Sequence, residues 1–385
     1  MLSGVNVALG VTGSISAVKC VELAHELRRN GASVRAVTTP ATTSILNPWA
    51  LEFATNNPVV AELTGAVEHV ALCGTEGWAD VFLIAPATAN TIGKIAAAID
   101  DTPVTTCATT AIGANIPVVV APAMHEPMWN HPGVLDAIDR LKDWNISFVS
   151  PRLEEGKAKI ASEEDVVTAV ATAATEQSLD GCEIVITSGA TTESIDPVRT
   201  LTNRATGKTG EAIARACAVR GANVTLIHNG PIQSFATVKT VESGAEMREK
   251  TLDVARSADV LISAAAISDF SVTTEDEKLD SGESYTLTLT PEPKLLDAAR
   301  DQCPDLTIVG FKAETGGDDE ALISAARSQL ERIGAACVVA NDASVMGEEA
   351  ARVIIVDGQS ATPIEGSKAT IGAHIADTVA TIMND

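Results

Sequence analysis

The chain has 385 residues, of which 45% are hydrophobic, and its formal net charge is −24. This length predicts two or three domains, and the hydrophobic content is sufficient for sizeable cores. The charge argues against nucleic-acid binding, which depends on lysine and arginine to neutralise phosphates, and no apolar run is long enough to span a membrane.

The cysteines are scattered, odd in number and never arranged as C-x-x-C pairs. This pattern argues against a disulfide framework and against a zinc site. We therefore expect free thiols and a cytoplasmic location.

The first half alternates β-branched runs with helical patterns. Val5–Val11 is predicted to be a buried strand, and Thr12–Ala17 is a small-residue loop that leads into a helix. Val34–Thr38 is the next strand. Val81–Ala85 and Pro117–Ala121 are further strands, and each runs into a loop that begins with proline. Alternation of this kind is typical of a parallel sheet covered by helices.

A polar linker, residues 176–181, follows a predicted helix over Glu163–Thr175. We place the domain boundary there, which gives domains of residues 1–177 and 178–385. Beyond it, Ile184–Ile186 and Asn223–Ile227 are predicted strands on either side of a glycine-rich loop and a helix. The fold class we predict is α/β, with two doubly wound Rossmann-like domains.

The glycine-rich loop of the second half suits an anion. Gly189 and Gly207 leave backbone N–H groups accessible, and the helix that begins after Gly210 adds partial positive charge. The alternative is a tight turn that binds nothing, because the glycines do not form a strict G-x-G-x-x-G.

The remaining segments of the second half continue the alternation. Val260–Ser263 is a predicted strand that ends in an alanine loop, and Thr307–Phe311 and Cys337–Ala340 are further strands. Asp318–Arg332 reads as a helix. Ile364–Met383 is expected to start in a loop and close with a helix.

Five segments of the first half, in family order, resemble the flavin-dependent cysteine decarboxylases. They are Val11–Lys19, Leu51–Val59, Glu68–Leu72, Trp78–Asp101 and Ala121–Trp129. The resemblance implies a flavodoxin-like domain that binds FMN. The residues it implies for FMN are Gly13, Ser14, Thr38, Thr39, Pro86, Ala87, Thr88, Asn90, Ala123 and Met124.

The same resemblance implies catalytic roles for two histidines and reveals three departures, one of which is a longer loop between His69 and Trp78. His69 stands where the family has its base, and a neutral imidazole is suited to that role. His125 replaces the family's asparagine, which can hold a substrate carboxylate. The family's flap cysteine, which gives the last proton, is missing. Lys157 and Lys159 lie in the flap instead, and Glu155 and Cys73 are further possible donors.

The second half resembles phosphopantothenate–cysteine ligases. The segments that carry the resemblance are Thr202–Gly210, Ala264–Phe270, Lys278 in "EKLD", Pro291–Leu296, Val309–Thr315 and Val338–Ser344. The residues it implies for CTP are Ser263, Ala264, Ala265, Asp269, Lys278, Pro293, Lys294, Leu295, Leu296 and Phe311. It also implies Asn203 and Arg199 at the acyl intermediate, a catalytic role for Asn203 and Lys278, and Mg²⁺ with the nucleotide.

Together the two resemblances imply a bifunctional enzyme of coenzyme A biosynthesis. Its substrates are 4′-phosphopantothenate, cysteine and CTP, its flavin is FMN, and it forms a homo-oligomer. One alternative is a ligase whose first domain is inactive or regulatory. A flavoprotein binding module without enzymatic activity and an NAD(P) dehydrogenase are weaker alternatives, since the ligase motifs are intact and no acidic residue follows either glycine loop as ribose binding requires.

Overall fold

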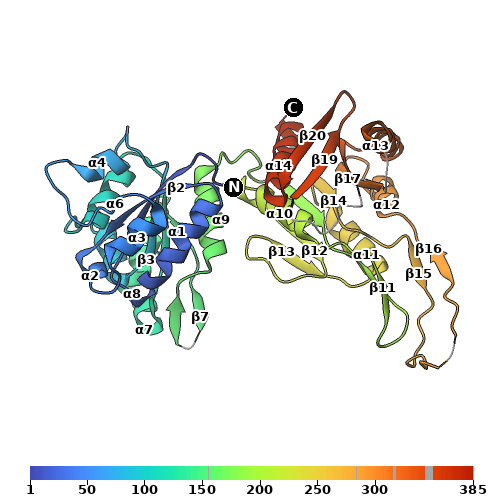
Figure 1. Ribbon diagram of the computed structural model, residues 1–385, viewed down its shortest axis with the longest axis horizontal. Helices are drawn as coiled ribbons and strands as arrows, with labels where there is room; N and C mark the ends of the chain where they lie inside the picture. Colours follow the sequence, from blue (N-terminus) through green and yellow to red (C-terminus); the bar gives the residue numbers. More distant parts are fainter. Residues whose placement is uncertain (155, 283, 315–317, 343–349, 385) are drawn as a thin grey trace. The chain divides into compact units, whose positions relative to one another are not determined.

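The computed structural model describes residues 1–154, 156–282, 284–314, 318–342 and 350–384. The chain divides into two compact units, Met1–Glu176 (unit 1) and Gln177–Asp385 (unit 2). Figure 1 labels the elements of both units.

Unit 1 is built on a five-stranded sheet in the order β2-β1-β3-β4-β6. Its strands are β1 (Asn6–Val11), β2 (Ser33–Thr38), β3 (Val81–Ala87), β4 (Val118–Pro122) and β6 (Ser147–Phe148). All four pairings are parallel. This is the 2-1-3-4-5 order of flavodoxin-like folds, so the expected fold of the first half is confirmed.

Helices cover this sheet because its central strands are mostly apolar. The helices are η1 (Ile15–Lys19), α1 (Cys20–Arg29), α2 (Pro40–Thr43), α3 (Pro48–Thr55), α4 (Glu68–Cys73), α5 (Ala89–Ala96), α6 (Pro103–Gly113), α7 (Glu126–Trp129), α8 (Pro132–Asp143) and α9 (Glu163–Ala174). Every residue of β3 is buried, as expected for a parallel strand covered on both faces. Phe82 and Ile84 pack with α4, α5, α6 and α8, and the intervening Leu83 faces the other side.

Three short strands form a separate antiparallel sheet, β5-β8-β7. They are β5 (Met124–His125), β7 (Arg152–Glu154) and β8 (Lys157–Lys159). The β7–β8 hairpin thus pairs with the segment that follows β4, and this pairing brings the predicted flap onto a predicted site segment.

Unit 2 contains an eight-stranded sheet in the order β13-β12-β9-β14-β17-β18-β19-β20. Its strands are β9 (Glu183–Thr187), β12 (Asn223–His228), β13 (Thr237–Thr240), β14 (Val260–Ser263), β17 (Thr307–Glu314), β18 (Cys337–Asp342), β19 (Ala350–Val356) and β20 (Ala361–Ser367). The strands from β13 to β18 are parallel and follow the Rossmann order 3-2-1-4-5-6, as the sequence predicted. β19 and β20 extend the sheet in antiparallel fashion.

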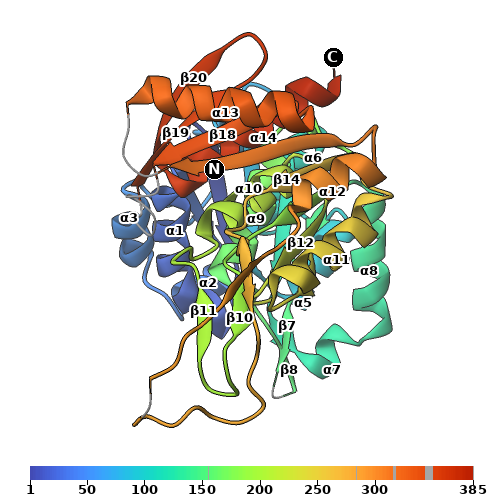
Figure 2. The same ribbon diagram turned by 90° about the vertical axis from the view of Figure 1, so that its right-hand side faces the viewer.

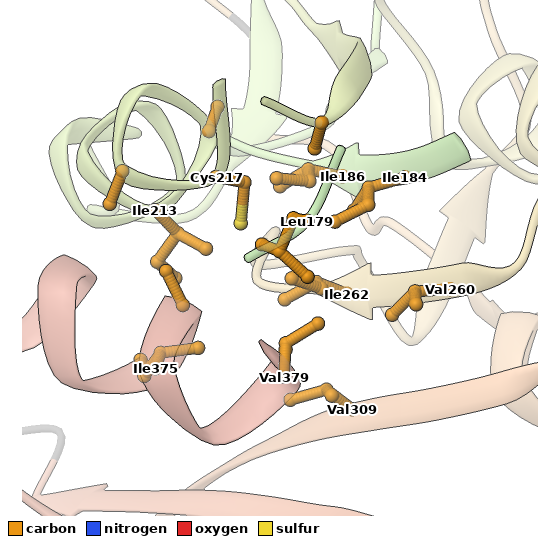
Figure 3. Packing of buried hydrophobic residues seen from close by; sticks show 14 of the residues in the cluster. Leu179, Ile184, Ile186, Ile213, Cys217, Val260, Ile262, Val309, Ile375 and Val379 are labelled. Atoms are coloured by element: carbon orange, nitrogen blue, oxygen red, sulfur yellow. The ribbon is translucent and has the colours of Figure 1, made fainter. Parts of the chain in front are cut away.

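The helices of unit 2 lie on both faces of this sheet. They are α10 (Lys208–Val219), α11 (Gly244–Ala255), α12 (Leu295–Gln302), α13 (Asp319–Ile333) and α14 (Lys368–Asn384). Figure 3 shows Ile213 and Cys217 of α10 meeting Ile375 and Val379 of α14 over the sheet. The other face packs against α11, α12 and α13. Among the described residues, no helix is both long enough and apolar enough to cross a membrane.

Two small ladders complete unit 2. β10 (Thr192–Ser194) pairs with β11 (Thr200–Thr202), and β15 (Phe270–Val272) pairs with β16 (Leu289–Pro291). Figures 1 and 2 show the β10–β11 hairpin and the chain that follows β15 running side by side away from the large sheet. The loop that the sequence predicted at Ile364 is instead part of β20, because pairing with β19 holds it extended.

Close packing of α10 and α14 leads to a stability prediction. A Cβ on Gly372 would lie 2.7 Å from the backbone C and O of Ala212. Gly372→Ala should lower the free energy of unfolding by roughly 1–3 kcal/mol, since this clash outweighs the gain of about 0.5–1 kcal/mol from replacing a helical glycine. Urea unfolding of unit 2 measures the loss. Gly358→Ala, which meets nothing within 4 Å, should leave the midpoint unchanged, and an unchanged midpoint for Gly372→Ala would contradict the packing.

Candidate active sites

A pocket of about 390 Å³ lies in unit 2 at the ends of β9, β14 and β17. Gly189 follows β9, and the alanine loop Ala264–Ala266 follows β14. β9 and β14 are neighbours in the sheet at the point where the strand order reverses, which is where ligands bind in open α/β sheets.

The glycine loop leaves no room for larger side chains. Gly189 and Gly207 have φ of +83° and +80°, a conformation that favours glycine. A Cβ on Gly210 would lie 2.4 Å from Oγ of Ser188, which donates a 2.8 Å hydrogen bond to the Gly207 carbonyl. The loop therefore presents the first turn of α10, from Lys208, to the pocket, and a helix N-terminus favours an anion.

Hydrogen bonds to β9 and the glycine loop hold the alanine loop in place. The N–H groups of Ala264 and Ala266 donate to the carbonyls of Thr187 and Gly189 at 3.1 and 2.8 Å. The side-chain amide of Asn203 donates to the Ala266 carbonyl at 3.0 Å. Asn203 does not line the pocket itself, but it contacts a residue that does.

The described lining of the pocket is rich in cations. It contains the side chains Lys208, Lys294, Lys312, Arg332, Arg352 and Lys368, and the acids Asp269 and Glu292. Lys294 is 2.9 Å from Asp269, and Lys312 is 2.9 Å from Glu314. Arg332 and Arg352 also form ion pairs, with Asp297 and with Asp319 and Glu365. In a chain of net charge −24, cations still outnumber acids in the described lining, which favours an anionic ligand.

Most residues that the sequence predicted for CTP line this pocket. They are Ser263, Ala264, Ala265, Asp269, Pro293, Lys294, Leu295, Leu296 and Phe311. Sequence reasoning missed Lys208 and Lys312, although both lie inside the segments that carried the resemblance. It also missed Arg352 and Lys368, for which the sequence offers no signal, since they come from β19 and the start of α14.

Lys278 and Arg199 lie outside the described lining of the pocket. Lys278 is exposed and follows β15 by six residues. The Arg199 guanidinium donates to the Asp196 carboxylate and, at 3.1 Å, to the Leu279 carbonyl. The structure thus places Arg199 next to the Lys278 segment rather than at the pocket.

In unit 1, the residues predicted for FMN gather at one edge of the sheet. Gly13 and Ser14 follow β1, Thr38 and Thr39 lie at the end of β2, and the others lie at the ends of β3 and β4. These four strands are neighbours and parallel, so their carboxyl ends form the crevice in which such sheets bind ligands. Thr12, on the same edge, donates to the Pro86 carbonyl at 2.6 Å and accepts from the Thr88 N–H at 3.2 Å.

Two features of this edge fit a flavin nucleotide. A Cβ on Gly13 would lie 2.5 Å from Cβ of Ala41, so only glycine keeps this approach open. The Thr38 side chain is 1% exposed, and its Oγ1 has no hydrogen-bond partner in the described part of the chain. A buried hydroxyl without a partner is costly, and a polar ligand atom would satisfy it.

His69 and Cys73 lie on α4 in different surroundings. His69 is half-buried, and its Nδ1 is buried without a partner among the described residues. Cys73 is fully buried and contacts Cys107 of α6; the hydrogen bond between these thiols, together with burial, raises the pKa of Cys107. Cys73 therefore lies in the core of unit 1, and not on the exposed surface of the loop that follows α4.

The flap hairpin brings Lys157 opposite His125. The two residues are register partners in the antiparallel pair of β5 and β8, and both are exposed. Lys159 lies two residues further along β8 and is half-buried. Glu155 lies outside the described residues. Two of the departures from the family pattern, at His125 and in the flap, therefore meet on one small sheet.

No group of three or more histidine, cysteine, aspartate or glutamate side chains in the described part of the chain could hold a metal ion. The described residues therefore offer no preformed metal centre in either unit.

Known proteins resemble both halves of the chain. The family described as "Flavoprotein" matches residues 1–175, and the family "DNA/pantothenate metabolism flavoprotein C-terminal domain" matches residues 179–383. A crystal structure of the C-terminal domain of a coenzyme A biosynthesis bifunctional protein CoaBC has 27% identity and a TM-score of 0.46, and the match covers 55% of this chain and 100% of that one.

Two curated relatives align with nearly the whole chain. The coenzyme A biosynthesis bifunctional protein CoaBC of Thermococcus kodakarensis is 49% identical over 362 residues, covering 92% of this chain and 89% of that protein. The protein of the same name from Methanocaldococcus jannaschii is 37% identical over 385 residues, covering 98% and 94%. With both family matches adjoining at the boundary between units, the chain belongs to the CoaBC family of bifunctional proteins of coenzyme A biosynthesis.

Proposed function

We propose that unit 2 joins cysteine to 4′-phosphopantothenate with CTP, and that unit 1 decarboxylates the product to 4′-phosphopantetheine with FMN. The ligase is assigned to residues 178–385 and the decarboxylase to residues 1–177. The observation that carries the proposal is the cation-rich pocket at the reversal point of the Rossmann sheet, beside a glycine loop. Family membership supports the pairing of the two activities.

In the ligase reaction, the carboxylate of phosphopantothenate attacks the α-phosphorus of CTP and releases pyrophosphate. Attack of one anion on another requires positive charge around the phosphates. Lys208, Lys312 and the α10 N-terminus supply that charge, and Mg²⁺ accompanies the nucleotide. The amine of cysteine then displaces CMP from the acyl-cytidylate. We assign Asn203 to this intermediate, because its side-chain amide is held by the carbonyl of Ala266, a residue of the pocket lining.

In the decarboxylation, the residues of unit 1 bind and orient the substrate. FMN, when bound, supplies a reversible two-electron oxidation of the thiol-bearing carbon, which allows the carboxylate to leave as CO₂. His69 takes up a proton from the substrate. His125 and Lys157, opposite each other on the β5–β8 pair, provide donors for the departing carboxylate, and Lys157 is suited to return the final proton.

We further propose a cytoplasmic homo-oligomer. All seven cysteines are free thiols, as a reducing compartment requires. Trp49 and Phe53 on α3 are 76% and 78% exposed and offer apolar surface for a contact between copies. Lys278 does not line the pocket of its own chain. In a homo-oligomer, Lys278 of one copy could instead act at the pocket of another copy.

Product analysis tests the proposal. Purified protein should show an FMN absorption spectrum, and 4′-phosphopantothenate, cysteine and CTP together should yield 4′-phosphopantetheine by mass spectrometry. Replacing CTP by ATP should reduce the yield. Accumulation of 4′-phosphopantothenoylcysteine by a colourless protein would instead support the alternative of a ligase with an inactive first unit. Formation of neither product would refute both.

A further inference from the structure

A buried carboxylate lies under the segment that carries Lys278. The side chain of Asp196, in the loop between β10 and β11, is fully buried. Both oxygens bond its own loop, and only Oδ2 also reaches a distant part of the chain. Oδ1 accepts from the N–H groups of Val198 and Arg199 at 2.7 and 2.6 Å, within its own loop. Oδ2 accepts from the Arg199 guanidinium and, at 3.1 Å, from the N–H of Leu279.

The second oxygen therefore holds a residue 83 positions away, directly after Lys278. The Leu279 carbonyl accepts from the Arg199 guanidinium, so both backbone groups of Leu279 are engaged. Upstream, Thr274 and Glu275 donate to the carbonyls of Ser194 and Ile195 at 2.8 and 2.9 Å. The chain from Thr273 to Asp280, which we call the Lys278 segment, is thus fixed on both sides of Lys278.

The side chain of Lys278 makes no hydrogen bond or ion pair with any described residue, and it is exposed. A long side chain on a segment without support would sample many positions, and catalysis by a cation depends on its position. Burial acts to raise the pKa of Asp196, but the hydrogen bonds from Val198, Leu279 and Arg199 lower it overall. The carboxylate therefore stays charged and keeps its hydrogen bonds to the Leu279 N–H and the Arg199 guanidinium.

We propose that Asp196 is a positioning residue of the ligase: through Oδ2 it fixes Leu279 and Arg199, and thereby the place from which Lys278 acts on the triphosphate. This inference rests on the proposed function of unit 2. It gives Arg199 a role in holding the Lys278 segment, in addition to the role implied at the acyl intermediate.

The variant Asp196→Asn distinguishes the role of Oδ1 from that of Oδ2. The amide oxygen keeps the bonds to Val198 and Arg199 N–H, whereas the NH₂ group meets the Leu279 N–H and the guanidinium as a donor facing donors. Asp357→Asn is the matched control, because Asp357 makes the same kind of turn, to the N–H groups of Gln359 and Ser360 at 2.7 and 2.6 Å. Asp357 lies in the turn between β19 and β20, away from the Lys278 segment.

The first readout does not depend on activity. Trypsin cleaves after lysine, and cleavage of the native chain after Lys278 requires the segment to open. Asp196→Asn should raise the rate of cleavage at this bond by about tenfold, whereas Asp357→Asn should not change it. An unchanged rate in Asp196→Asn would overturn the inference.

The second readout is kinetic coupling. Asp196→Asn should lower kcat for ligation by about 10- to 100-fold and leave decarboxylation unchanged. The double variant with Lys278→Ala should be no slower than Lys278→Ala alone, because both substitutions remove the same contribution, that of Lys278 to the transition state. Additive losses in kcat would indicate a merely structural role for Asp196 and overturn the inference. If wild type formed no acyl-cytidylate, the proposed function would fail, and the trypsin result would still decide whether Asp196 fixes the segment.

Discussion

Lys278→Ala should reduce CTP-dependent ligation by about 10²- to 10³-fold while leaving decarboxylation at the wild-type rate. The reason is electrostatic. The attacking carboxylate and the triphosphate repel each other, and a cation that meets the transition state lowers that barrier more than it strengthens binding of CTP. The loss should therefore appear mainly in kcat.

The measurement is the rate of 4′-phosphopantothenoylcysteine formation at saturating CTP, with CO₂ release from that compound followed separately. Lys239→Ala is the control, because Lys239 lies on β13 and does not line the pocket. Loss of both activities would indicate damage to the whole chain.

Retention of ligation by Lys278→Ala would contradict the assigned role. The remaining cations of the pocket would then have to be sufficient, and Lys312→Ala tests this directly, since Lys312 lines the pocket next to Phe311. If Lys312→Ala lost ligation activity and Lys278→Ala kept it, the cation that stabilises the transition state would be Lys312 of β17 and not Lys278.

The sequence predicted elements well where burial leaves a pattern. β3 and β4 are continuous apolar runs because helices cover both of their faces, and such runs are readable without a structure. β20 was missed because most of its side chains are exposed and it contains Pro363 and Gly366. Pairing with β19 alone holds it extended, and a residue pattern does not report such pairing.

The same distinction applies to the candidate sites. The glycine loop and the alanine loop each follow a buried strand, and Phe311 lies within β17, so contiguous segments of sequence predicted all three. Arg352 reaches the pocket only because β19 adds to β18 in antiparallel fashion. The hydrogen bond from the Leu279 N–H to the Asp196 carboxylate joins two loops that are 83 positions apart in the sequence. Strand order and loop-to-loop contacts arise from tertiary packing, and neither leaves a local signal.

The variant His69→Gln tests the decarboxylation proposed for unit 1, as Lys278→Ala tests the ligation proposed for unit 2. His69→Gln should reduce decarboxylation by about 10²- to 10⁴-fold, which is the usual contribution of a positioned acid–base group. Glutamine keeps a polar side chain of similar reach, but it cannot take up a proton. Because the proposed base acts after ligation, the variant should accumulate 4′-phosphopantothenoylcysteine when it is given 4′-phosphopantothenate, cysteine and CTP, and mass spectrometry detects this compound directly.

The flavin absorption separates loss of the base from loss of the cofactor. His69 lies on α4, whereas the residues proposed for FMN lie at the ends of β1 to β4, so His69→Gln should keep the wild-type spectrum. His25→Gln on α1, where the ring meets Phe53 edge-on at 6.1 Å, is the matched control and should retain full activity. A colourless His69→Gln protein would assign His69 to flavin binding, and wild-type CO₂ release would remove it from the mechanism altogether.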